Sequence, residues 1–163
     1  MARDLNEFER GILANVEAHG CQVNHIFGGE GDEPDFSYSI GFPQSVGQPE
    51  VIVFGLGVNL MKSMINELRA QCAGGLTMAD RLRVADLLDG FECELRSVDR
   101  ANIAEDFFAS AMWFERYRTG EQMTEAFQIV WPGASQGLFP WEDGCNPFVG
   151  ASQTALYEQG TVH

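Results

Sequence analysis

Basic residues are scarce in this chain of 163 residues, which has 10 Lys and Arg against 24 Asp and Glu and a formal net charge of −14. Proteins that bind a nucleic-acid backbone need clustered Lys and Arg, so the charge argues against a nucleic-acid partner. An acidic surface instead favours a cationic partner, such as a basic protein, or serves solubility alone.

Cysteine motifs and targeting segments are also missing. The four cysteines are scattered without CxxC spacing, and the first residues, MARDLNEFERG, lack the basic and apolar parts of a signal peptide. No apolar run approaches the roughly 18 to 20 residues that span a bilayer. We therefore expect a cytoplasmic protein that does not bind membranes. Its length predicts a single domain, residues 1–163, with a tail that frays from about residue 153.

The chain is organised around residues 35–56, where two apolar runs flank a segment with two prolines. In residues 36–41 apolar residues alternate with small or polar ones, which is typical of a strand with one buried face. Residues 51–54 are continuously β-branched or aromatic, which predicts a central strand covered on both faces. Residues 43–49 between them should form an exposed connection, and such loops often carry function.

Apolar residues at helical spacing predict three helices. The first covers residues 4–18. The second is capped by Asn59, has Leu60 on its buried face and ends at the following glycine pair. The third opens at Asn102, because Asn102 and Glu105 have the spacing of a capping box.

The remaining segments predict further strands, near residues 21–27, 91–96 and 127–131 and, less regularly, 82–87. Charged residues alternate with apolar ones in residues 91–96, so one face of that strand should be wet. Strands interspersed with helices and joined by loops favour α+β over a doubly wound parallel fold. We expect a mainly antiparallel central sheet of about five strands with about three helices packed on it.

Three residues at the ends of predicted strands are candidates for catalysis: His25, Tyr38 and Glu50. An imidazole titrates near neutral pH and a phenol can donate to an oxyanion, so His25 and Tyr38 in neighbouring strands could serve acid–base chemistry. A structural interpretation of this pair is stronger. In it, the histidine is satisfied by a backbone carbonyl, and the tyrosine packs its ring and keeps its hydroxyl wet.

Metal and phosphate sites are poorly supported. His19, Cys21 and His25 form an H-x-C-x3-H grouping that could hold a soft divalent metal, but no fourth ligand is nearby. Gly55-x-Gly57 precedes a predicted helix as in a phosphate loop, yet the Walker pattern requires a glycine where Met61 stands. We therefore expect no metal and no cofactor.

An aromatic segment near the end of the chain is the remaining candidate site. Trp131, Phe139 and Trp141 are either core residues or one wall of an apolar pocket that faces a ligand. The core interpretation is the better supported one, because tryptophan is costly to expose.

Three segments together resemble a known family: ILANVEAHG, then FSYSIGF followed by PEVIVFGL, then QIVWP with GLFPWEDG. In order and spacing, from Gly11 to Phe148, they are similar to the uncharacterised bacterial family catalogued as domain of unknown function 4262. Cys21 stands where that family commonly has an aromatic residue, and Gly133 where an acid often follows the WP pair. The resemblance implies no established activity.

Two functions remain open. The first is a protein-interaction or regulatory module that recognises a basic partner such as a toxin, as indicated by the charge and by the acidic loop at residues 30–35. The alternative is an enzyme or small-ligand binder with a site near His25, Tyr38 and the Trp131/Trp141 segment. This alternative predicts that these side chains converge on one concave site.

Overall fold

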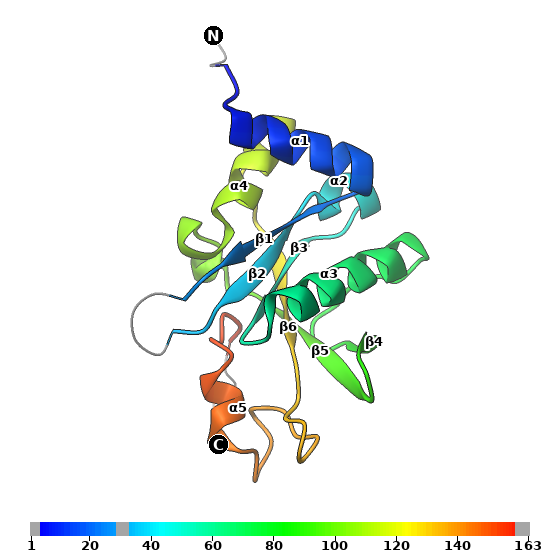
Figure 1. The fold of residues 1–163 in the computed structure, drawn as a ribbon, viewed down its shortest axis with the longest axis vertical. Coiled ribbons are helices and arrows are strands. Elements are labelled where there is room, and N and C mark those ends of the chain that lie inside the picture. Colours follow the sequence, from blue (N-terminus) through cyan, green and yellow to red (C-terminus); the bar gives the residue numbers. More distant parts are fainter. Residues whose placement is uncertain (1–3, 29–32, 159–163) are drawn as a thin grey trace.

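The computed structural model describes residues 4–28 and 33–158, and the elements follow one another along the chain as Figure 1 shows. The strands are β1 (Gln22–Ile26), β2 (Phe36–Ile40), β3 (Glu50–Phe54), β4 (Arg83–Leu88), β5 (Phe91–Ser97) and β6 (Ala126–Val130). The helices are α1 (Glu7–His19), α2 (Phe42–Val46), α3 (Val58–Ala73), α4 (Glu105–Thr119) and α5 (Pro147–Ala151), with a short 3-10 turn, η1 (Arg100–Asn102).

The strands form one six-stranded sheet in the order β1-β2-β3-β6-β5-β4. All neighbouring pairs are antiparallel except β3 and β6, which are parallel, with Glu50 opposite Ala126 and Val53 opposite Ile129. The predicted α+β fold with a mainly antiparallel sheet is therefore confirmed, and β3 is a central strand as expected. Among the described residues, no helix is long and apolar enough to cross a membrane.

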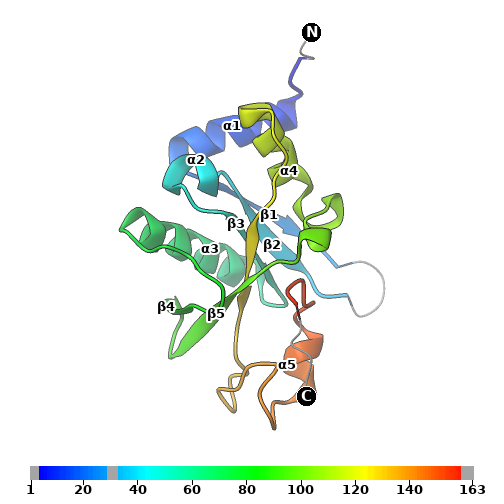
Figure 2. The ribbon, with the colours of Figure 1, turned by 180° about the vertical axis from the view of Figure 1, so that it is seen from behind.

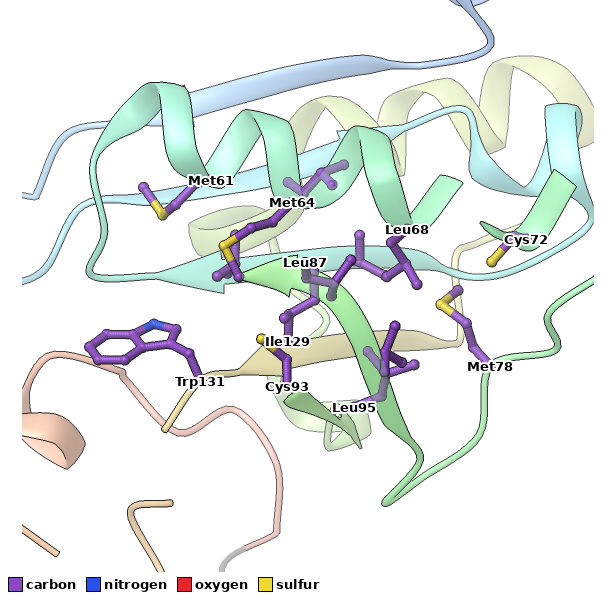
Figure 3. Packing of buried hydrophobic residues seen from close by; sticks show 14 of the residues in the cluster. Met61, Met64, Leu68, Cys72, Met78, Leu87, Cys93, Leu95, Ile129 and Trp131 are labelled. Atoms are coloured by element: carbon purple, nitrogen blue, oxygen red, sulfur yellow. The ribbon is translucent and has the colours of Figure 1, made fainter. Parts of the chain in front are cut away.

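Helices cover both faces of the sheet. On one face, α3 places Met61, Met64 and Leu68 against strand residues such as Leu95 and Ile129, as Figure 3 shows. On the other face, α1 and α4 pack on β2 and β3 through an aromatic core, and both helices are visible together in Figure 2. The side chains of this second core include Ile12, Val16, Phe36, Tyr38, Ile52, Phe54, Phe108 and Phe114.

Strand β2 has the predicted face of small residues, but it is buried on both faces, whereas a half-buried strand was expected. Ser37 and Ser39 are fully buried, although their alternation with apolar residues is the pattern of a half-exposed strand. The small serine side chains lie on the face that α3 covers, and both hydroxyls are hydrogen bonded there. Burial of a polar group is tolerated when it is hydrogen bonded in this way.

Helix starts differ from the predictions because capping depends on local geometry. A capping box is present at α1, where the Asn6 side chain accepts from the Glu9 N–H and Glu9 binds back to the Asn6 N–H. The predicted box at Asn102 is wrong, because η1 occupies that segment and α4 begins at Glu105 after Ala104. Helix α3 begins at Val58 after Gly57, so Asn59 lies inside the helix instead of capping it, and Leu60 is 41% exposed.

Three further segments differ from the sequence predictions or show structure that was not predicted. The predicted wet face of β5 holds only at Glu92, which is exposed, because Glu94 and Arg96 are both buried. The connection before β3 contains the five-residue helix α2. In the tail, Tyr157 is buried and forms an isolated bridge with Val98. The acidic loop at residues 30–35 lies partly outside the described residues.

Candidate functional site

Glu50, the first residue of β3, is a buried carboxylate held by three hydrogen bonds. Its Oε1 atom accepts from Ser39 Oγ at 2.7 Å and from the Phe42 N–H at 3.1 Å, and its Oε2 atom accepts from the Gly41 N–H at 2.7 Å. In the described part of the chain, no Lys, Arg or His side chain forms an ion pair with Glu50. Its negative charge is therefore met by neutral donors alone.

Burial raises the pKa of Glu50 from its ordinary value of 4.5 to about 7, because the charged form loses its hydration. The three hydrogen bonds act in the opposite direction, since they favour the carboxylate, while the negative charge of Glu115 raises the pKa further. A carboxyl group with such a pKa exchanges its proton near neutral pH, which makes Glu50 sensitive to any charge brought close to it.

The chain between β2 and β3 is shaped to hold this carboxylate. Gly41 has a φ of +108°, and a Cβ atom at this position would lie 2.8 Å from Val16 Cγ1. Only glycine fits both the backbone conformation and the space, and the turn it makes brings two successive N–H groups to Glu50. Ser39 completes the arrangement, because its Oγ atom also accepts from the Val51 N–H at 2.9 Å.

Glu50 also lines a pocket of about 230 Å³ between α2, α4 and the start of β6. Two more carboxylates line this pocket: Glu115 of α4 is partly exposed and pairs with Arg118 at 2.6 Å, and Glu125 is exposed. The remaining lining residues are Pro43, Gly47, Gln48, Pro49, Met123 and Thr124. The pocket therefore has a wall of mixed apolar and polar residues and three acidic side chains. Such a lining suits a positively charged ligand group.

His25 lies in a polar cluster at the β1–β2 end. Its Nδ1 atom is 2.8 Å from Ser37 Oγ, and its Nε2 atom is 3.7 Å from Asp35 Oδ2. The three residue types are those of a hydrolase triad, but a nucleophilic serine must touch its substrate and Ser37 is fully buried. Asp35 is further engaged by the Gly28 N–H at 2.7 Å. The cluster ties the ends of β1 and β2 together.

Tyr38 points to the opposite face of the sheet from His25. His25 is opposite Ser37 in the strand register and Tyr38 is opposite Asn24, so the two candidate side chains leave the sheet on different sides. The Tyr38 hydroxyl accepts from Asn24 Nδ2 at 3.2 Å and from the Ser110 N–H at 3.1 Å. Its ring packs in the core between α4 and the sheet. The structure therefore does not bring His25 and Tyr38 into one site.

The aromatic segment is divided between two places. Trp131 is buried beside Met61 and Met64, and its Nε1–H donates to the Phe54 carbonyl at 2.7 Å (Figure 3). Phe139 and Trp141 stack on each other with ring centroids 5.1 Å apart, in a separate cluster with Tyr157. Among the six candidate residues, Glu50 is the one that lines the acidic pocket, and none of the other five does.

Two arginines that the sequence did not single out complete the Phe139 and Trp141 cluster. Arg83 lies 4.2 Å above the Phe139 ring, and Arg96 lies 4.9 Å from the Trp141 ring and 4.7 Å from that of Tyr157. Glu94 joins the two, at 2.7 Å from Arg83 Nε and 3.7 Å from Arg96 Nη1. The only available signal was the alternation of charges along β5, which indicates a solvated face as readily as a buried cluster.

The residues that surround Glu50 could have been found only in part. Ser39 and Gly41 lie in the segment FSYSIGF, whose alternation indicates a strand but does not show that its serine face is buried. Glu115 and Glu125 come from parts of the chain more distant in sequence and carry no motif. Within the described residues, no group of three or more His, Cys, Asp or Glu side chains is arranged to hold a metal ion.

Comparison with known proteins gives a family and no activity. Neither the curated proteins nor the solved structures include a match. One family model, described as a domain of unknown function, matches residues 15–146, which covers both β3 and the pocket around Glu50. The chain therefore belongs to the DUF4262 family.

Proposed function

We propose that the protein is a binding module that recognises a basic partner protein by accepting a lysine or arginine side chain in the Glu50 pocket. The observation that supports this most strongly is a buried carboxylate without a cationic partner in the described residues, in a pocket lined by two further carboxylates. A cationic side chain would supply the missing counter-charge. It would also favour the ionised form of Glu50, whose pKa is near 7.

The size of the pocket agrees with a single side chain as its guest. Sites for drug-sized molecules usually have about 300 to 1,000 Å³. This pocket has about 230 Å³. Glu50 retains hydrogen-bonding capacity, since a carboxylate offers about four acceptor positions and three are filled by Ser39, Gly41 and Phe42. An ammonium or guanidinium group has donors suited to the remaining position and to Glu115 and Glu125.

The charge of the whole chain supports the same proposal. A net charge of −14 attracts a basic partner over distance and speeds encounter, while the pocket fixes where one cationic side chain is held. The alternative, an enzyme or small-ligand binder built on His25, Tyr38 and the Trp131/Trp141 segment, has less support. Tyr38 and Trp131 are buried, and His25 points to the other face of the sheet from Tyr38. The exposed Trp141 stacks on Phe139 in a separate cluster, so a common ligand surface has no support.

A decalysine peptide tests the proposal as a defined probe. Its affinity is measured at low salt for the wild type, for Glu115→Gln/Glu125→Gln, and for Glu17→Gln/Glu92→Gln as a control. The two double variants change the net charge equally, and the control residues are exposed and outside the pocket. We expect the pocket variant to bind about tenfold more weakly than the control variant. Equal losses in the two variants would show diffuse attraction and contradict the proposal.

A further inference from the structure

A second concave site is the groove between α1, β1 and α3. We propose that this groove binds a small organic oxyanion, a ligand that presents a phosphate or carboxylate group. The inference goes beyond the proposed function, because no residue of this groove lines the Glu50 pocket and the charge it would attract is of the opposite sign.

The groove is large enough for a small molecule. Its volume is about 830 Å³, within the range of about 300 to 1,000 Å³ that is common for ligand sites. Polar side chains line it from three elements: Asn15 and His19 from α1, Gln22 from β1, and Lys62, Asn66 and Arg69 from α3. Because these donors come from two helices and a strand instead of from loops, their relative positions are fixed.

The groove is lined by positively charged side chains, although the chain as a whole is strongly acidic. Lys62 is the only lysine in a sequence with a net charge of −14, and it lines this groove together with Arg69. In the part of the chain that the structure describes, no Asp or Glu lines the groove, and neither Lys62 nor Arg69 has an ion-pair partner. Two cations are thus left available to a ligand in a protein with an excess of carboxylates.

The three polar residues of α3 share one helical face. Lys62, Asn66 and Arg69 are spaced at i, i+4 and i+7, so they follow one another along two turns. The two cationic residues are separated by about 10 Å along the helix axis. Such a row of donors can hold an anionic group at either end of an elongated ligand, with the Asn66 amide between them.

Arg69 is positioned by the end of α1. Gly20 caps α1 with a φ of +85°, and a Cβ atom there would come within 2.7 Å of Arg69 Nη1 and 2.9 Å of Arg69 Cζ. The guanidinium group therefore lies directly against the Gly20 backbone. Cys21 adds no negative charge beside it, because burial raises the pKa of its thiol to about 11. The competing role for Arg69 is to complement the carbonyl end of α1 without any ligand.

Amide NMR titrations distinguish these roles. Inorganic phosphate and citrate are each added at constant ionic strength to the wild type, Lys62→Gln, Arg69→Gln and the control Arg116→Gln, which removes an exposed cation from α4. We expect saturable shifts of the Asn66 side-chain amide and the Arg69 Nε–Hε group with at least one anion. The response to phosphate or to citrate identifies the class of oxyanion. Affinity should fall about tenfold in Lys62→Gln and Arg69→Gln and stay unchanged in Arg116→Gln.

Two outcomes would overturn the inference. One is the absence of saturable shifts in the groove with both anions. The other is an equal loss of affinity in Arg116→Gln, which would show unspecific attraction to any surface cation. Lys62→Gln keeps the test valid if Arg69→Gln lowers stability, because the Lys62 side chain is exposed and makes no hydrogen bond within the described residues.

Discussion

Ser39 and Glu50 form a buried hydrogen-bonded pair across β2 and β3, with Ser39 Oγ 2.7 Å from Glu50 Oε1. The same hydroxyl oxygen accepts from the Val51 N–H at 2.9 Å, so one serine serves both a carboxylate and a strand backbone group. Because Glu50 has no charged partner in the described residues, its ionised form depends on this hydroxyl and on the N–H groups of Gly41 and Phe42.

Replacement of Ser39 by alanine should destabilise the fold. The change leaves the Val51 N–H and one position of the Glu50 carboxylate without a partner in a buried environment. We expect the free energy of unfolding to fall by about 2 to 3 kcal/mol, measured by urea denaturation. Ser45→Ala, at an exposed position in α2, is the control and should change it by less than about 0.5 kcal/mol. A loss in Ser39→Ala no larger than in the control would show that the pair contributes little.

The pKa of Glu50 predicts a specific pH dependence of stability. Below pH 4.5 the carboxyl group is protonated in both states, whereas between pH 4.5 and about 7 only the folded state keeps the proton. The contribution of Glu50 to stability is therefore fully present below pH 4.5 and is lost as the pH rises through about 7. The size of this loss is about 2 to 4 kcal/mol.

Glu50→Gln isolates that contribution, since the amide cannot titrate. The free energy of unfolding of Glu50→Gln minus that of the wild type should rise between pH 4.5 and pH 8, and any fixed cost of the amide adds a constant. Urea denaturation across this range gives both curves. Parallel curves for the two proteins would mean that the pKa of Glu50 is not raised in the folded state.

Gly41 should tolerate no side chain. Gly41→Ala places a Cβ atom 2.8 Å from Val16 Cγ1 at a φ of +108°, so steric overlap adds to backbone strain. We expect a loss of about 3 kcal/mol, against about 1 kcal/mol for Gly47→Ala, where φ is also positive but no atom lies within 4 Å. In thermal denaturation, Val16→Ala/Gly41→Ala should lose less than the sum of the two single variants. Strict additivity would contradict the predicted overlap.

Tyr38 is predicted to act through its hydrogen bonds in the fold. Tyr38→Phe removes the acceptor for the Ser110 N–H and for Asn24 Nδ2, and should lower the free energy of unfolding by about 1 to 2 kcal/mol. Tyr117→Phe is the matched control and should be nearly neutral, because Tyr117 is 53% exposed. If both variants unfold like the wild type, the hydroxyl of Tyr38 has no structural role.

The centre of the sheet could be predicted from sequence because its signals are local. The alternation in β2 and the continuous apolar run in β3 give both strands within a residue of their observed bounds. What β2 packs against was not readable, because α3 follows β3 in the chain and no period in residues 36–40 records its presence. The same limit applies to Arg96, which lies against the rings of Trp141 and Tyr157 from much later in the chain, and to Glu94, which is buried beside Arg96.

The candidate site was predicted in part for the same physical reason. Glu50 could be named as a residue at the start of a central strand, but its pocket needs Glu115 from α4 and Glu125 from the approach to β6. His25 and Tyr38 were proposed together because their strands are neighbours. The register, which sets His25 opposite Ser37 and Tyr38 opposite Asn24, sends their side chains to different faces and could not be read from composition.

The most direct test of the Glu50 pocket is the pKa of Glu50 itself, measured from its side-chain carboxyl ¹³C shift with and without saturating decalysine. A lysine ammonium group in the pocket favours the carboxylate, so we predict that the peptide lowers this pKa from about 7 by at least about one unit. A pKa of Glu50 that stays the same in the saturated complex would contradict the proposed binding of a cationic side chain.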